Sequence, residues 1–192
     1  MTPHIVITGA PASGKSEFVE RLQSEPLFAD CVFFGELARR LLTENPHYRH
    51  QAMAFHTEIY RRQTEREADA AGRPFVTDRG TLDAFAFHPE AMSAVGTSIE
   101  REYARYSAVI QLGSAATLGE PYYQRDEIRR ESPDEALAIE RALRAVWSGH
   151  PAYRFVSARN NYADKYAEFL ALASALIVEK GLDNRLSITS LS

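Results

Sequence analysis

The sequence predicts a three-layer α/β fold, in which a parallel sheet of five strands is covered by helices on both faces. Two observations lead to this prediction. Short apolar runs alternate with longer helical stretches along the chain, and a glycine or an acidic residue directly follows four of the five runs. Strands separated by helices form β-α-β crossovers, and a sheet built from such crossovers is parallel and buried on both faces.

The five apolar runs are the predicted strands. Each is short and largely apolar, which is typical of a strand with both faces buried. In chain order they comprise residues 4–8, 31–34, 74–77, 108–112 and 153–156.

Helices are predicted between and after these strands. Four stretches carry helical patterns, at residues 14–24, 36–44, 50–71 and 162–180, and the last is expected to end at Gly181. Thr97 with Glu100, and Ser132 with Glu135, have the spacing of a capping box, so a helix is expected to begin at each. Pro133 also fits the first position of the second of these helices.

Composition favours one domain over residues 1–192. The length of 192 residues is sufficient for a sizeable core, and 45% of the residues are hydrophobic. A net charge of −4 predicts no footprint for nucleic acid, and no apolar run is long enough to span a membrane. The single cysteine, Cys31, forms no internal disulfide, and no secretion signal is recognised, so a cytoplasmic location is expected. Composition does not predict an oligomeric state.

Residues 9–16 match the phosphate-binding pattern G-x-x-x-x-G-K-[ST] in full, directly after a predicted strand and at the start of a helix. Its glycines allow a tight turn, and successive backbone N–H groups bind phosphate. Lys15 is expected on the β- and γ-phosphates, and Ser16 on Mg²⁺. The predicted cofactors are therefore ATP and Mg²⁺, with a nucleotide-binding set of Gly9, Ala10, Pro11, Ala12, Ser13, Gly14, Lys15, Ser16 and Glu17.

The third strand is directly followed by an acidic residue, Asp78. Ligands of parallel sheets gather outside the carboxyl ends of the strands, and the fourth strand supplies no acid there. Asp78 is thus predicted to bind the metal ion, directly or through water. Its neighbour Arg79 is a candidate for contacting a phosphoryl oxygen. The alternative is that Asp78 caps the next helix and Arg79 is a surface charge.

Glu36 follows the second strand at the same sheet edge, where a carboxylate could accept a proton from a substrate hydroxyl. The alternative is an acid favoured by a helix N-terminus. Further along, Arg125 and Arg129 are four residues apart and share a helix face, so an anion between them would relieve their repulsion. Residues 118–132 are therefore expected to form a lid over the phosphates; the alternative is a solvated helix with acid–base pairs.

Asn160 and Asn161 follow the fifth strand, where folds of this kind place the loop that binds the nucleotide base. Asn161 and Asp164 have the spacing of the guanine motif Asn-Lys-x-Asp, but Tyr162 replaces its lysine. A GTPase switch is disfavoured for this reason, and an AAA+ machine is disfavoured because the chain is too short for a separate helical domain.

These motifs together resemble a known family. The chain is similar to the P-loop ATPase/kinase-like domains related to the ribosylnicotinamide kinase part of bacterial NAD regulators, within the superfamily of thymidylate and deoxynucleoside kinases. The matching residues are those of the phosphate loop, Glu36 with Ala38-Arg39, and Asp78-Arg79-Gly80 followed by Asp83-Ala84. The resemblance implies strand order 2-3-1-4-5, a lid, and a role for Asp78 on magnesium or as the base.

Two functions from different classes follow. The first is a small-molecule kinase that transfers the γ-phosphoryl group of MgATP to a nucleoside-like or other small metabolite. The second is a regulatory ATP- or GTP-binding module that hydrolyses slowly and has no acceptor. A second pocket across from the phosphate loop, near Glu36 and Arg79, would distinguish the kinase from the binding module.

Overall fold

The computed structural model of the chain describes residues 2–123 and 131–189, with side chains up to residue 181. Its centre is a parallel sheet in the order β2-β3-β1-β4-β5, which confirms the predicted fold class and strand order. The strands are β1 (His4–Gly9), β2 (Val32–Phe34), β3 (Phe75–Asp78), β4 (Ala108–Leu112) and β5 (Tyr153–Val156). Each predicted run agrees with the observed strand to within one residue at either end.

The register of the sheet brings the chemical groups to one edge. Ile7 of β1 is paired with Asp78 of β3, and Gly9 of β1 with Leu112 of β4. The phosphate loop begins at the carboxyl end of β1, so it lies between the ends of β3 and β4. Asp78 is therefore adjacent to the loop, although 62 positions separate it from Ser16 in the sequence.

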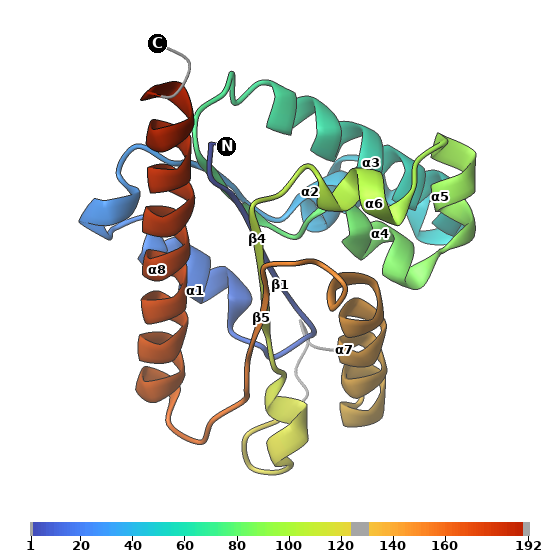
Figure 1. Cartoon of the computed structure of the whole chain (residues 1–192). Coiled ribbons are helices and arrows are strands. Elements are labelled where there is room, and N and C mark those ends of the chain that lie inside the picture. Colours follow the sequence, from blue (N-terminus) through green and yellow to red (C-terminus); the bar gives the residue numbers. More distant parts are fainter. Residues whose placement is uncertain (1, 124–130, 190–192) are drawn as a thin grey trace.

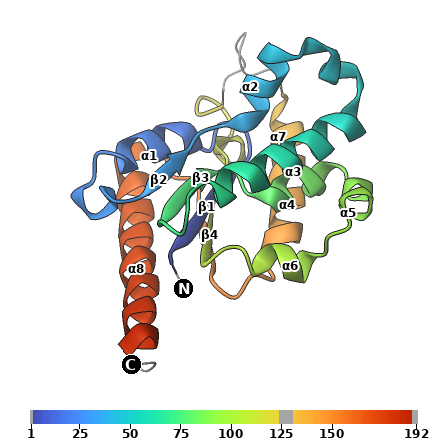
Figure 2. The same ribbon diagram turned by 90° about the horizontal axis from the view of Figure 1, so that it is seen from above.

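Helices cover both faces of the sheet (Figures 1 and 2). On one face lie α1 (Lys15–Leu22) and α8 (Tyr162–Thr189), and on the other lie α3 (Ala52–Ala68), α4 (Thr81–Phe87) and α7 (Pro133–Trp147). Alternate residues of β1 enter the two cores. Ile5 and Ile7 pack with Phe18 and Phe169, whereas Val6 packs with Trp147 and its neighbours. Burial on both faces explains why this strand is continuously apolar.

Short elements complete the part of the chain that the structure describes. They are three 3₁₀ turns, η1 (Pro26–Phe28), η2 (Pro46–His50) and η3 (Ala115–Leu118), and three short helices, α2 (Leu37–Glu44), α5 (Glu90–Val95) and α6 (Ile99–Tyr103). The capping box of Ser132 and Glu135 is present at the start of α7, as predicted. At α6 the cap is Ser98, whose hydroxyl accepts from the Arg101 N–H, so placing the capping box at Thr97 was wrong by one residue.

Helix ends differ from the prediction at two further places. α3 begins at Ala52 because residues 46–50 form η2, and it ends at Ala68. α8 does not end at Gly181 but continues to Thr189. Gly181 is absent from the positive-φ glycines of the described chain, so it does not adopt the left-handed conformation that ends a helix. A glycine inside a helix costs only about 1 kcal/mol relative to alanine, which a long helix tolerates.

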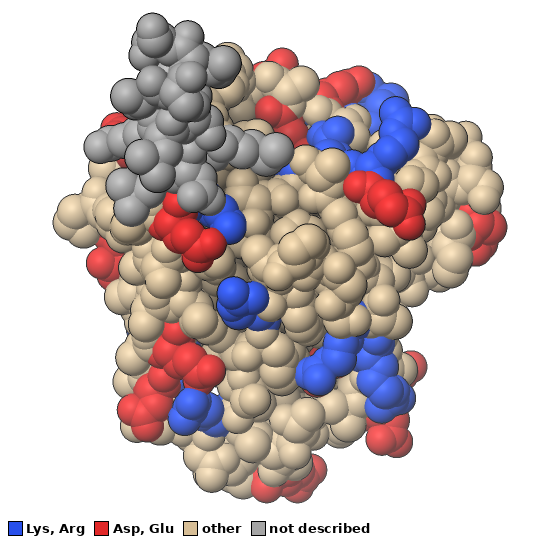
Figure 3. Space-filling view, in the orientation of Figure 1, with Lys and Arg blue, Asp and Glu red and all other residues tan. Residues whose placement is uncertain are grey.

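The surface carries both basic and acidic side chains. On the face drawn in Figure 3, basic and acidic groups of the described residues are interspersed. Within the described part of the chain, no helix combines the length and apolar character that crossing a membrane requires.

A buried carboxylate joins β1, α4 and α7. Asp83 Oδ1 accepts hydrogen bonds from Thr8 Oγ1 at 2.7 Å and from Trp147 Nε1 at 3.0 Å. Its Oδ2 accepts from the Gly80 N–H at 2.9 Å, which closes the first turn of α4. Burial raises the pKa of Asp83, and these three donors oppose that shift.

We predict that Thr8→Val lowers the free energy of unfolding by about 1 to 3 kcal/mol, because the isosteric change removes a donor from this carboxylate. Chemical denaturation measures the change. Thr43→Val is the control, since Thr43 is exposed and its hydroxyl bonds only to the Arg39 carbonyl of its own helix. Equal stabilities of the two variants would contradict the prediction.

Candidate functional site

The phosphate loop turns sharply because of its two glycines. A Cβ at Gly9 would lie 2.6 Å from Ser13 Oγ and 2.8 Å from the Leu112 carbonyl oxygen, so only glycine fits. Gly14 has φ +81° and forms the N-cap of α1. Ala12 also has a positive φ, of 60°, which is unusual for alanine and indicates a loop held by its surroundings.

The turn after β4 holds the loop from behind. Ser114 Oγ donates to the Pro11 carbonyl at 2.6 Å, and the Ala115 N–H donates to the Ala12 carbonyl at 3.0 Å. These carbonyls point toward the protein. A loop whose carbonyls are bound on one side presents backbone N–H groups on the other, as an anion site requires.

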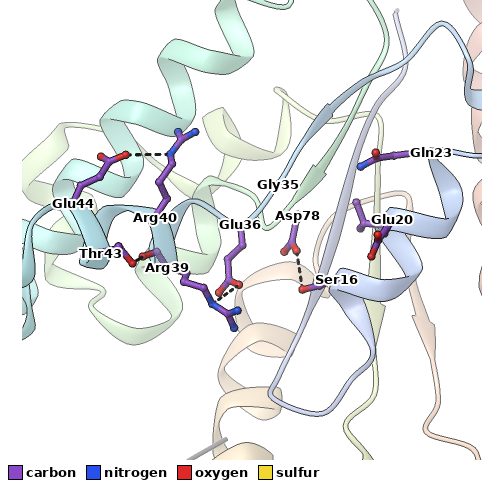
Figure 4. Close-up of a pocket in the computed structure, with 11 residues that line it drawn as sticks. Ser16, Glu20, Gln23, Gly35, Glu36, Arg39, Arg40, Thr43, Glu44 and Asp78 are labelled. Carbon is purple, nitrogen blue, oxygen red and sulfur yellow. Dashed lines mark hydrogen bonds and ion pairs between the residues drawn. The ribbon is translucent and has the colours of Figure 1, made fainter. Parts of the chain in front are cut away.

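Lys15 and Asp78 form an ion pair at the centre of the site. Lys15 Nζ lies 2.5 Å from Asp78 Oδ1, and both side chains are buried. Ser16 Oγ donates to Asp78 Oδ2 at 3.4 Å (Figure 4). Burial lowers the pKa of Lys15, the Arg79 guanidinium lowers it further, and Asp78 opposes both effects. The structure thus brings together the three residues predicted for the γ-phosphate and the metal.

These groups fit a magnesium ion. Mg²⁺ in nucleotide sites takes one or two carboxylates together with phosphate oxygens and water, rather than a cage made wholly of protein. Ser16 and Asp78 supply a hydroxyl and a carboxylate side by side. The described residues contain no group of three His, Cys, Asp or Glu side chains placed to hold a metal.

Arg79 has an unusual backbone conformation directly after β3. Its φ is +72°, and its N–H donates to the Ile7 carbonyl at 2.9 Å. The Thr77 hydroxyl donates to the Arg79 carbonyl at 2.8 Å, which fixes the turn. Nη1 of Arg79 is buried and has no hydrogen-bond partner among residues 2–123 and 131–181. A buried, unpaired guanidinium nitrogen is costly, so Arg79 is held in a position suited to an anionic or polar ligand.

Two cavities open around the loop. One, of about 400 Å³, is lined by residues 10–17 together with Glu36, Arg39, Arg79 and Glu131. The other, of about 620 Å³, lies between α1 and α2 (Figure 4). Glu36 borders both cavities and forms an ion pair with Arg39 at 3.7 Å. The predicted loop residues from Ala10 to Glu17 therefore surround one space with Glu36 and Arg79.

A third, smaller cavity lies on the other side of Glu36 and Arg79. It measures about 170 Å³ and has aromatic walls from Phe55, His56 and Phe87. The ring centroids of His56 and Phe87 are 6.1 Å apart. Among the described residues, buried Nδ1 of His56 has no hydrogen-bond partner, and burial lowers the pKa of His56 to about 4. His56 is therefore neutral at pH 7.

Comparison with known proteins assigns most of the chain to one family. A family model described as an AAA domain matches residues 4–165, from β1 to the first turn of α8. The chain belongs to this family of AAA domains. A search of the curated proteins finds no match.

Among solved structures, the fold of this chain is similar to the structure of a deoxyadenosine kinase from M. mycoides with products dCMP and a flexible dCDP bound. The TM-score is 0.62 at 12% identity, and the alignment covers 90% of this chain and 99% of that one. The likeness supports the P-loop kinase-like fold expected from the sequence. A closer relation to ribosylnicotinamide kinase domains stays a prediction.

The remaining predicted residues have different surroundings. Asn161 Oδ1 accepts from the Ala163 N–H at 2.9 Å and so caps α8, while Asn160 lies beside it in an exposed loop. Neither lines the cavities described above. Arg125 and Arg129 lie outside the described residues, as does the whole segment 124–130 of the predicted lid at 118–132.

Sequence reasoning missed Lys165 as a site residue. Its ammonium group donates to the Ser13 carbonyl of the phosphate loop at 2.7 Å. One signal was available: the chain has only three lysines, and Lys165 lies one helical turn after Asn161, beside the incomplete guanine motif. Arg39, one of the residues that carry the family resemblance, lines the loop cavity. Phe87 had no sequence signal, because its helix was not predicted.

The ion pair makes Lys15 and Asp78 interdependent. We predict that Lys15→Met and Asp78→Asn each lower the free energy of unfolding by about 3 kcal/mol, because each leaves the other charge buried without its partner. The loss in the free energy of unfolding of the double variant should be smaller than the sum of the losses of the two single variants. A double-mutant cycle by chemical denaturation measures the coupling, and strictly additive losses would contradict a buried pair.

Proposed function

We propose that the protein is a kinase that transfers the γ-phosphoryl group of MgATP to a hydroxyl group of a small, nucleoside-like metabolite. The observation that carries this proposal is the aromatic cavity beside the phosphate-loop cavity. Glu36 and Arg79 line both spaces. A module that only bound and hydrolysed nucleotide would not need a second cavity at this position.

The proposed step is an in-line transfer. The acceptor oxygen forms a bond to the γ-phosphorus, the bond from that phosphorus to the β,γ-bridging oxygen breaks, and ADP leaves with the bridging oxygen. The acceptor proton passes to the Glu36 carboxylate, which lines both cavities. Lys15 and Arg79 neutralise the charge on the transferred group. Magnesium held by Ser16 and Asp78 supplies further charge neutralisation when bound.

The acceptor cavity is small, so it favours a nucleoside-like molecule that places a single flat ring in it. Its volume of about 170 Å³ is below the 300 Å³ or more of typical drug-sized sites. Phe55, His56 and Phe87 line it with aromatic rings. The solved structure of similar fold belongs to a deoxyadenosine kinase, which makes nucleosides the first acceptors to test.

The base of ATP is proposed to lie toward the loop after β5, near Asn160 and Asn161, with Glu17 at the start of α1. The loop after β5 leads directly into α8, and Tyr162, the first residue of α8, packs against Gly14 of the phosphate loop. The loop after β5 is therefore next to the phosphate loop. The ring carbon Cε2 and hydroxyl of Tyr162 lie 3.1 Å from the site of a Cβ on Gly14.

The experiment that tests the proposal is a thermal-shift screen of nucleosides and other small hydroxylated metabolites with MgADP present. A kinase should be stabilised further by its acceptor, because a ligand that binds only the folded state raises the melting temperature. Hits are then assayed for phosphorylated product. Slow ATP hydrolysis with no acceptor would instead indicate the regulatory nucleotide-binding module.

We predict that Glu36→Gln lowers kcat about 100-fold or more for the acceptor found, because general-base catalysis contributes roughly 10²- to 10⁴-fold. Affinity for MgADP should stay within about twofold. Glu44→Gln is the matched control, since Glu44 ends the helix that Glu36 caps and lines the large cavity but not the aromatic one. If Glu44→Gln is as damaging as Glu36→Gln, the acceptor binds in the large cavity.

We also predict that Asp78→Asn removes most of the gain in ADP affinity that magnesium gives the wild type. The amide keeps the size of the side chain but lacks the charge that holds the ion. Metal-free ADP should bind no more weakly than to wild type, because Lys15 is released from its partner. Calorimetry with magnesium or with a chelator measures both, using exposed Asp30→Asn as control. An unchanged magnesium effect would place the metal ligand elsewhere.

A further inference from the structure

Lys165 is a buried ammonium group that the proposed reaction does not use. It lies on the first turn of α8 and is 4% exposed. Nζ donates to the Ser13 carbonyl and to the Gly113 carbonyl, both at 2.7 Å. No carboxylate of the described residues forms an ion pair with it. Burying a charge without a direct partner is costly, so these two carbonyl contacts require an explanation.

The geometry of the peptide unit gives that explanation. The Ser13 carbonyl and the Gly14 N–H belong to the same peptide, which is trans, so they point in opposite directions. Lys165 holds the carbonyl toward the protein interior. The Gly14 N–H is thereby directed away from Lys165, toward the space that Gly14 and Lys15 line.

The Gly113 carbonyl links the ammonium group of Lys165 to the negative charge of Glu140. Gly113 C=O accepts from Lys165, and the N–H of the same peptide, on Ser114, donates to Glu140 Oε2 at 2.6 Å. One peptide dipole therefore stands between an ammonium and a carboxylate. Glu140 raises the pKa of Lys165, but burial dominates and lowers it to about 8. The charge is stabilised through the backbone and not by an ion pair.

We propose that Lys165 is a positioning residue of the phosphate site, which orients and polarises the Gly14 N–H toward a diphosphate and adds positive charge behind the loop. The proposal rests on nucleotide binding as part of the proposed function, but not on any acceptor. Lys15 acts on the phosphates from the front of the loop, and Lys165 acts from behind it. The third lysine, Lys180, lies farther along α8 and pairs with Glu179.

The test measures binding of MgADP and of inorganic pyrophosphate, which has no base or sugar, by calorimetry. Lys165→Met should weaken both about tenfold or more, whereas Lys165→Arg, which keeps the charge, should recover a large part of the loss. Lys180→Met is the matched control on the same helix and should bind both probes like wild type. A residue that only secured α8 would change the melting temperature and leave the affinity of the folded protein unchanged.

Lys165→Gln is the second variant if Lys165→Met does not fold, because its amide keeps an N–H donor for the Ser13 carbonyl while losing the charge. It should still weaken pyrophosphate several-fold. Folded Met or Gln variants with wild-type affinity for both probes would overturn the proposal, as would a loss confined to MgADP. A wild type that binds neither probe would overturn both this inference and the nucleotide site. Failure to find an acceptor would affect the kinase proposal alone.

Discussion

The buried ion pair between Lys15 and Asp78 is the interaction on which the site depends. It exists because β1 and β3 are neighbours in a register that places Asp78 beside the start of the phosphate loop. Each partner also has a second use, since an ammonium binds phosphate and a carboxylate binds a metal ion. Under the proposed function, nucleotide entry would exchange partners at this buried pair: a phosphate would become the partner of Lys15, and a metal ion would become the partner of Asp78. This exchange avoids leaving a buried charge unpaired.

The features that sequence could predict are those with a local pattern. Each strand is a continuous apolar run, and the phosphate loop is a complete motif whose glycines and lysine have fixed spacing. The order of the strands followed from the resemblance to P-loop kinases, and the observed topology confirms it. Asp78 was placed at the sheet edge because strand ends converge there, and it does lie beside Ser16.

Other features depend on contacts between distant segments. The partners of Lys165 are 152 and 52 positions away, so no window of sequence contains the arrangement. The aromatic cavity is formed where α3 meets α4, and α4 is too short to show a helical period. The predicted end of the last helix at Gly181 was wrong for a different reason. A glycine ends a helix when its backbone adopts the left-handed conformation, and the residue type alone does not show whether it does so.

The position of the aromatic cavity in the fold determines which substitutions the protein can accept there. Phe55, His56 and Phe87 are only partly buried and lie on helices outside the sheet, whereas Lys15, Asp78 and Thr8 are fixed within the central core. Substitutions at the three aromatic positions alter the shape and polarity of that cavity with little cost to folding. Selectivity for the proposed acceptor could therefore change between related proteins while Lys15, Asp78 and Thr8 stay the same.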